Sequence, residues 1–140
     1  DYTMMGDTVN TAARLEGVNK IYGIYTLVCE HTYQKAGNRV AGREIDAVNV
    51  VGKKEPVVVY QLLGLPEDLP EDLLKTIQIY AEGLRHYRQL KWDAAITAFE
   101  SALKITPDDG PSLAMAERCR EYRVSPPPAG WNGSYTMKTK

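Results

Sequence analysis

The opening stretch of the chain holds an amide and a guanidinium at helical spacing. In GDTVNTAAR, residues 6–14, Asn10 and Arg14 lie four residues apart, just after a Gly-Asp turn. Side chains four apart project from nearly the same face of a helix. A permanently charged guanidinium fork and an amide near the positive end of a helix suit a phosphate ester. The same spacing also occurs on an exposed polar face, so spacing alone leaves both interpretations open.

The composition is that of an ordinary soluble globular protein. The chain has 140 residues, with 44% hydrophobic and 25% charged residues, enough for one domain or two small ones. A formal net charge of -1 gives no bulk attraction to nucleic acid or to an anionic membrane, so we expect no nucleic-acid partner. Cys29 and Cys119 lie far apart, which favours a reduced, cytoplasmic setting without a disulfide framework.

Two features bear on the ends of the chain and on membranes. No apolar run approaches the roughly 18 residues that a membrane span requires, and no signal-peptide pattern is present, so we expect no membrane segment in this chain. A membrane anchor, if the protein is the cytoplasmic part of a receptor, would lie elsewhere. The sequence begins at Asp1 and enters strand-like sequence at once, which we interpret as a piece of a longer protein.

The elements that must position Asn10 and Arg14 are predicted from residue 1 to residue 64. Asp7 is a good N-cap and Gly23 a plausible stop for the helix that carries both residues, and Gly37 closes the shorter helix predicted after it. A four-residue, glycine-led loop, residues 52–55, joins the last two strands as a hairpin. We expect that hairpin at one edge of a sheet. The predicted order is strand, helix, strand, helix, strand, strand, over residues 1–5, 8–22, 23–30, 31–37, 43–51 and 56–64.

The rest of the chain is predicted to be helical. Residues 65–72 hold two prolines and four acids and form a predicted linker. Residues 73–124 then show helical periodicity, and residues 125–140 are predicted to be an irregular tail, in which Trp131 and Tyr135 could dock on another part of the chain. The helical part resembles a tetratricopeptide repeat, with an unrelated helical hairpin as the alternative. The repeat pattern is carried by Gly83, Tyr87, Ala95, Phe99, Ala102 and Pro107, and Leu90 departs from it where a glycine is usual. The small residues at 83, 95 and 102 predict that two antiparallel helices approach closely, with Phe99 filling the groove between them.

The first part also resembles a known enzyme family. DYTMMGDTVNTAARLEGVNKIYG, followed by a strand and a GKKEPV hairpin, is similar to the strand-turn-helix signature of class III adenylyl and guanylyl cyclases. The resemblance covers about residues 1–64, and a helical repeat is a known kind of appendage in bacterial members. It implies an α+β fold, the C-terminal portion of a ferredoxin-like cyclase catalytic domain, followed by an all-α repeat.

That resemblance implies an activity and roles for particular residues. Such enzymes convert a nucleoside triphosphate into a 3′,5′-cyclic nucleotide and pyrophosphate. Asn10 would orient the ribose, and Arg14 would neutralise charge on the α-phosphate in the transition state. Thr3 matches a purine-reading position and favours ATP, although a threonine chosen for strand propensity is the alternative. A triphosphate-binding lysine is replaced by Val51, so Lys53 or Lys54 could take its place, or both could be an exposed hairpin tip.

The family's two metal-binding aspartates would lie before Asp1, so two Mg or Mn ions would be bound by residues outside this chain. Each site in the family forms between two subunits, which implies a homodimer with shared sites and an inactive isolated piece. A partner of the repeat is a further expectation. The alternatives are a guanylate cyclase and a non-catalytic, cyclase-like interaction module.

Overall fold

The structure, a computed structural model, describes residues 16–24, 26–50 and 52–137. It divides the chain into two compact units. The sheet unit comprises residues 1–68 together with 134–140, and the helical unit comprises residues 69–133. Within the described ranges, no helix combines the length and the apolar character that crossing a membrane would need.

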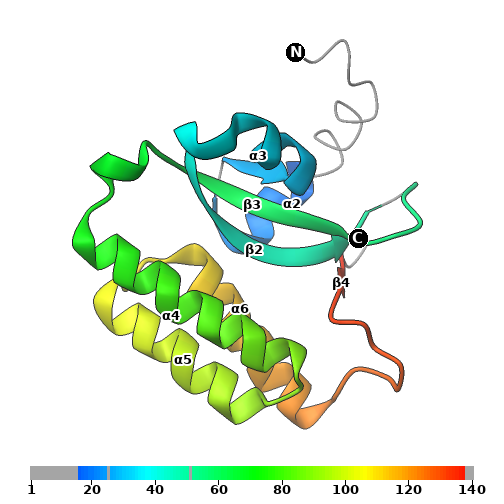
Figure 1. Ribbon diagram of the computed structural model, residues 1–140. Helices are drawn as coiled ribbons and strands as arrows, with labels where there is room; N and C mark the ends of the chain where they lie inside the picture. Colours follow the sequence, from blue (N-terminus) through cyan, green and yellow to red (C-terminus); the bar gives the residue numbers. More distant parts are fainter. Residues whose placement is uncertain (1–15, 25, 51, 138–140) are drawn as a thin grey trace. The chain divides into compact units, whose positions relative to one another are not determined.

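The sheet unit is built on four strands, β1 (Leu27–Cys29), β2 (Ala41–Asn49), β3 (Val57–Gly64) and β4 (Tyr135–Thr136), in the order β1-β3-β2-β4. Strand β3 pairs antiparallel with both β1 and β2, whereas β4 pairs parallel with β2 (Figure 1). The predicted hairpin is therefore present as β2 and β3. Our prediction that it lies at one edge is wrong, because β1 and β4 flank it. The edge positions go to β1, which lies within the strand predicted over 23–30, and to β4, which the sequence pattern does not indicate.

A β-bulge in β2 decides which of its side chains are buried. Glu44 pairs with Tyr60 and Asp46 with Val59, so Ile45 is an extra residue. Before the bulge the buried positions have odd numbers, and after it they have even numbers. A bulge brings two successive side chains to one face. This strand therefore buries the acid Asp46 next to Ile45. Strict alternation would place these two side chains on opposite faces.

Two short helices pack on opposite faces of the sheet. Helix α2 (Glu16–Tyr22) buries Val18 and Tyr22 completely. Helix α3 (Glu30–Ala36) stacks Tyr33 on Tyr60, with ring centroids 4.3 Å apart, and a Cβ at Gly42 would overlap that Tyr33 ring. Neighbouring residues of a strand face opposite ways, so Val59 and Tyr60 of β3 point to different faces of the sheet. Tyr60 faces α3. Val59 pairs with Asp46, which accepts a hydrogen bond from Tyr22 of α2.

The predicted ends of these helices are confirmed where the structure describes them. Helix α2 ends at Tyr22, and Gly23 follows with φ of 65°. Helix α3 ends before Gly37, whose φ is also 65°, a positive value that glycine adopts without steric cost. The strand predicted over residues 23–30 is shorter, because α3 begins at Glu30 directly after β1.

The helical unit contains α4 (Glu71–Arg88), α5 (Trp92–Ile105) and α6 (Gly110–Val124). The predicted linker is only partly irregular. Residues Pro66–Asp68 form a 3₁₀ turn at the end of the sheet unit, and the acids at 71 and 72 already belong to the first turn of α4. Acidic side chains are favourable in a first helical turn, which explains why this acidic segment continues as helix.

The close approach of α4 and α5 that the small residues predict is confirmed. A Cβ added at Gly83 would come within 2.6 Å of the Phe99 ring. Tyr80 packs on the same ring with centroids 5.2 Å apart, and Ala95 and Ala102 are fully buried. Phe99 therefore occupies the space that the glycine leaves. Whether the pair belongs to the tetratricopeptide class stays a prediction.

The turn between α4 and α5 explains the departure at Leu90. Its φ is 62°, the only positive φ among the non-glycine residues that the structure describes. Glycine adopts this conformation without steric cost, whereas a side chain is strained there. The backbone thus keeps the shape that a glycine would give, although the residue is a half-exposed leucine.

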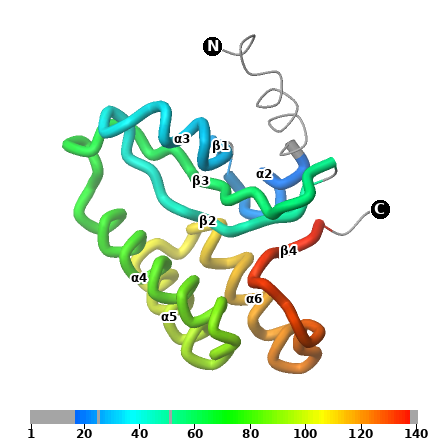
Figure 2. The backbone as a smooth tube through the Cα atoms, turned by 45° about the vertical axis from the view of Figure 1, so that its right-hand side comes forward, coloured from blue at the N-terminus to red at the C-terminus, as the bar shows by residue number. Residues whose placement is uncertain are grey.

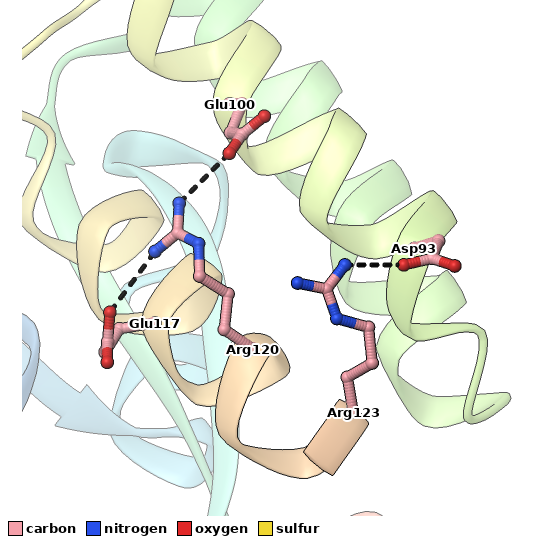
Figure 3. Close-up of polar contacts among 5 residues, drawn as sticks. All are labelled: Asp93, Glu100, Glu117, Arg120 and Arg123. Atoms are coloured by element: carbon pink, nitrogen blue, oxygen red, sulfur yellow. Dashed lines mark hydrogen bonds and ion pairs between the residues drawn. The ribbon is translucent and has the colours of Figure 1, made fainter.

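Helix α6 is capped and is tied to α5. The Asp109 carboxylate accepts hydrogen bonds from the Ser112 backbone N–H (3.2 Å) and hydroxyl (2.5 Å), an N-cap arrangement. Along the exposed side, Figure 3 shows two arginines of α6 reaching acids of α5 and of α6 itself. These pairs are Arg120 with Glu100 (3.0 Å) and Glu117 (3.2 Å), and Arg123 with Asp93 (2.8 Å). Exposed pairs of this kind contribute about 0.2–1 kcal/mol each.

The tail is more ordered than predicted. An aromatic cluster in the helical unit, formed by Tyr87, Trp92, Tyr122 and Trp131, includes a tail residue, with centroid distances of 5.2–6.2 Å. Farther on, Tyr135 and Thr136 form β4. The prediction that 125–140 is irregular is therefore wrong at Tyr135–Thr136, whereas the docking expected of Trp131 and Tyr135 is present. Both placements depend on partners that are distant in the sequence, so the local sequence of the tail does not predict which residues it contacts.

Candidate functional site

The main predicted site residues, Thr3, Asn10 and Arg14, lie outside the residues that the structure describes. The last two turns of the helix predicted over 8–22 are described, as α2. The structure therefore shows which contacts hold the C-terminal end of the helix predicted to carry Asn10 and Arg14. These contacts are described first.

A buried hydrogen bond fixes the end of α2 to the sheet. The Tyr22 hydroxyl donates to Asp46 Oδ2 over 2.6 Å, and both residues are fully buried. The other carboxylate oxygen, Oδ1, accepts the Ala47 backbone N–H at 2.8 Å. A buried carboxylate is costly unless it is hydrogen-bonded, so this arrangement specifies where α2 ends on the sheet.

Sequence reasoning missed this contact. The available signal was a carboxylate inside a strand of otherwise apolar and alternating residues. Alternation from Arg43 and Ile45 would place Asp46 on the other face, and only the bulge brings it under α2.

A second buried polar pair lies on the same face. Arg43 is almost fully buried, and its guanidinium donates to Gln61 Oε1 from Nη2 (2.6 Å) and from Nε (3.2 Å). The two residues are direct neighbours across β2 and β3. These hydrogen bonds join the two central strands, β2 and β3, and they give the buried Arg43 guanidinium a partner within the sheet.

The two predicted phosphate-binding lysines lie in the loop between β2 and β3. Gly52 has φ of 88°, and the Lys53 backbone N–H donates to the Val50 carbonyl over 3.2 Å. The Lys54 side chain is exposed and that of Lys53 is half-buried. Val51, the position of the departure from the family, lies outside the described residues. The structure thus brings both lysines to one turn, and their role with a triphosphate stays a prediction.

Among the described residues, no group of three or more His, Cys, Asp or Glu could hold a metal ion. In the sheet unit, Glu44 and Asp46 lie in β2 and Glu30 begins α3, and Asp46 already accepts a hydrogen bond from Tyr22. The described part of the chain therefore does not fit a divalent-metal centre.

Comparisons with known proteins point in one direction. The chain is 31% identical over 121 residues to "Adenylate cyclase, terminal-differentiation specific" of Dictyostelium discoideum, an alignment that covers 84% of the chain and 6% of that protein. It is 36% identical over 64 residues to "Adenylate cyclase 1" of Rhizobium meliloti (strain 1021), covering 46% of the chain and 10% of that protein. No model of a protein family matches the sequence, and no solved structure matches it.

The chain is thus related in sequence to proteins named adenylate cyclase, and it spans a tenth or less of their length. An alignment of 121 residues is longer than either unit and extends across both. The helical unit is therefore part of the shared sequence. The class III assignment, the bacterial type and the roles of individual residues remain predictions.

Proposed function

We propose that this chain is part of an adenylate cyclase of class III, which converts ATP into 3′,5′-cyclic AMP and pyrophosphate in the cytoplasm. The observation that carries the proposal is the similarity to the Dictyostelium adenylate cyclase, which extends across both units. The GDTVNTAAR signature supports it independently. Its predicted glycine turn, predicted N-capping acid and amide-guanidinium pair at helical spacing suit a phosphorylated ligand.

Arg14 is the proposed transition-state residue. During attack of the ribose 3′-oxygen on the α-phosphorus, negative charge grows on the α-phosphate oxygens. A guanidinium carries a permanent charge and two parallel donors, which match those oxygens. A donor that meets charge developing in the transition state lowers the barrier more than it tightens substrate binding.

The other residues would bind and orient the substrate. Asn10 would hold the ribose, since its amide both donates to and accepts from hydroxyls. Thr3 would contact the purine, and Lys53 or Lys54 would approach the triphosphate from the β2–β3 loop. The buried hydrogen bond from Tyr22 to Asp46 supports this arrangement, because it anchors the end of the helix predicted to carry Asn10.

The complete enzyme would need groups that this chain does not supply. Following the family resemblance, we propose that two Mg or Mn ions are bound by residues outside this chain, in a homodimer with shared sites. An isolated copy of the chain would then be inactive.

The experiment uses the longer protein of which we propose this chain is a part. Arg14→Ala should lower turnover by roughly a hundred- to a thousand-fold, about 2.7–4 kcal/mol, with little change in KM for ATP. Lys20→Ala provides a matched control, because Lys20 is an exposed cation on the same helix. Its turnover should stay within about twofold of the parent, since it meets no charge in the transition state.

A complementation assay then tests the shared site. The Arg14→Ala protein is mixed with a protein that lacks the metal-binding aspartates, and the mixture should regain activity that neither component has alone. An Arg14→Ala enzyme with unchanged turnover would refute the proposed role. Preference for GTP would identify a guanylate cyclase, and no cyclic product from either nucleotide would identify a non-catalytic module.

A further inference from the structure

The described turns of α2 bury one row of side chains. Val18 and Tyr22 stand four residues apart, and both side chains are fully buried. Figures 1 and 2 both show α2 lying against β2 and β3. Residues four apart project from nearly the same face of a helix, so this row lies on the buried face of α2.

The row continues toward the proposed site residues. In the helix predicted over residues 8–22, Asn10 and Arg14 precede Val18 and Tyr22 at the same step of four. Successive members of such a row are offset by about 40° around the helix. The direction of every member depends on how the helix is rotated about its own axis. A contact that fixes this rotation at Tyr22 would therefore also fix the directions in which Asn10 and Arg14 point.

The hydrogen bond of Tyr22 is suited to fixing this rotation. The Tyr22 hydroxyl donates to Asp46 Oδ2 over 2.6 Å, and such a short bond tolerates little sideways movement of the ring. The Ala47 backbone N–H donates to the other carboxylate oxygen over 2.8 Å, which holds the acceptor in place. The bulge at Ile45 brings this carboxylate to the face under α2. Apolar packing alone would let the ring slide, whereas a hydrogen bond to a held oxygen selects one orientation.

A separate backbone contact ends the helix. The Ile24 backbone N–H donates to the Asn19 carbonyl over 3.1 Å, across Gly23 at φ of 65°. This is the hydrogen bond of a Schellman motif at a helix end. It determines where α2 stops, and it does not involve the side chain of Tyr22. Loss of the Tyr22 hydroxyl should therefore leave the helix formed and release its rotation.

From these contacts we propose that Tyr22 is a positioning residue for the adenylate cyclase reaction. Its hydrogen bond to Asp46 fixes the rotation of the helix about its axis, and thereby the directions of Asn10 and Arg14. The link to catalysis rests on the proposed function. A rotation of about ten degrees moves the end of a side chain at the helix surface by about 1 Å. A misplacement of about 1 Å can lower a rate about a hundred-fold.

Kinetics of the longer protein test the positioning role. Tyr22→Phe should lower turnover by roughly ten- to a hundred-fold. KM for ATP should stay within about threefold of the parent, because Tyr22 is fully buried and Arg14 acts mainly in the transition state. Tyr33→Phe is the matched control. The Tyr33 ring stacks on Tyr60 on the opposite face of the sheet, so turnover of this variant should stay within about twofold of the parent.

The double variant Tyr22→Phe with Asp46→Asn separates positioning from stability. It replaces the buried carboxylate that has lost a donor by a neutral amide, so stability should recover in part. It restores no hydrogen bond from the helix to the sheet, so turnover should stay as low as in Tyr22→Phe. Turnover that recovers in step with stability would overturn the proposal. Unchanged turnover in Tyr22→Phe alone would overturn it as well.

Methyl NMR spectroscopy of the 140-residue chain measures the rotation without an activity assay. Val18 is fully buried on the same row, so Tyr22→Phe should shift its methyl resonances. Phenylalanine keeps the ring, so a shift reports movement of the helix and not loss of the ring. Val28 is the reference, because it pairs with Tyr60 and shares the opposite face of the sheet, and its resonances should stay in place.

This measurement keeps the two proposals distinguishable. Unchanged Val18 resonances in Tyr22→Phe would overturn the fixed rotation. If the unmodified longer protein makes no cyclic nucleotide while the Val18 resonances shift, the proposed function fails and the fixed rotation of α2 stands.

Discussion

The contact between Gly83 and Phe99 gives the sharpest quantitative prediction for the helical unit. A Cβ at position 83 would lie 2.6, 2.9 and 2.9 Å from three atoms of the Phe99 ring. Real Cβ atoms essentially never come this close to another atom, so either the ring or the helices must shift. Gly83 and Phe99 are both buried, and Tyr80 packs on the ring, which restricts where it can go.

Two opposing effects set the magnitude for Gly83→Ala. Replacing a helical glycine by alanine stabilises a helix by about 0.8–1 kcal/mol. Overpacking a well-packed core costs about 1–3 kcal/mol. We therefore expect Gly83→Ala to lower the free energy of unfolding of the helical unit by about 1 kcal/mol, close to a fivefold change in the unfolding constant.

Urea unfolding followed by tryptophan fluorescence is the assay. Both tryptophans of the chain, Trp92 and Trp131, belong to the aromatic cluster, so the signal reports on the helical unit. A double-mutant cycle with Phe99→Leu isolates the overlap, since a smaller side chain leaves room for the new methyl group. In that background Gly83→Ala should be neutral or stabilising.

A matched control comes from the exposed face of α4. Ala81→Gly should cost about 0.8–1 kcal/mol from propensity alone, and it should show no coupling to Phe99→Leu. The reasoning would be refuted if Gly83→Ala stabilised the protein with Phe99 present. It would also fail if the cycle gave no coupling energy.

Two further predictions concern local geometry. Leu90→Gly should raise the free energy of unfolding of the helical unit by about 1 kcal/mol, since it removes a side chain at φ of 62°. The same urea assay checks it. The control is Gln89→Gly at φ of -94°, which should destabilise the unit. No gain from Leu90→Gly would contradict the strain argument. Tyr22→Phe removes the 2.6 Å donor to a buried carboxylate and should cost the sheet unit about 1–3 kcal/mol. Faster hydrogen exchange of the Val59 amide would show this loss. The double variant Tyr22→Phe with Asp46→Asn should recover part of it. Unchanged exchange in Tyr22→Phe would refute the anchoring role.

The sequence by itself determined the elements whose signals are local. Gly23 and Gly37 mark helix ends because glycine adopts a positive φ there without steric cost, and both ends are confirmed. Periodicity placed α4 and α5, and the small residues predicted their close approach, with Gly83 facing Phe99. The hairpin followed from two β-branched runs joined by a glycine-led loop. Each signal acts within one element or between neighbours along the chain.

Only the tertiary structure decided the features that depend on distant partners. The bulge that turns Asp46 toward α2 arises from pairing with β3, and alternation along β2 predicts the opposite face. The flanked position of the hairpin depends on β4, which comes from the tail. Strand β4 needs no periodic pattern of its own. Its two residues pair with Val48 and Asn49, and the Asn49 side-chain amide donates hydrogen bonds to Ser134 and Thr136. Its partners are more than eighty residues away in the sequence, at positions that only the folded chain brings together.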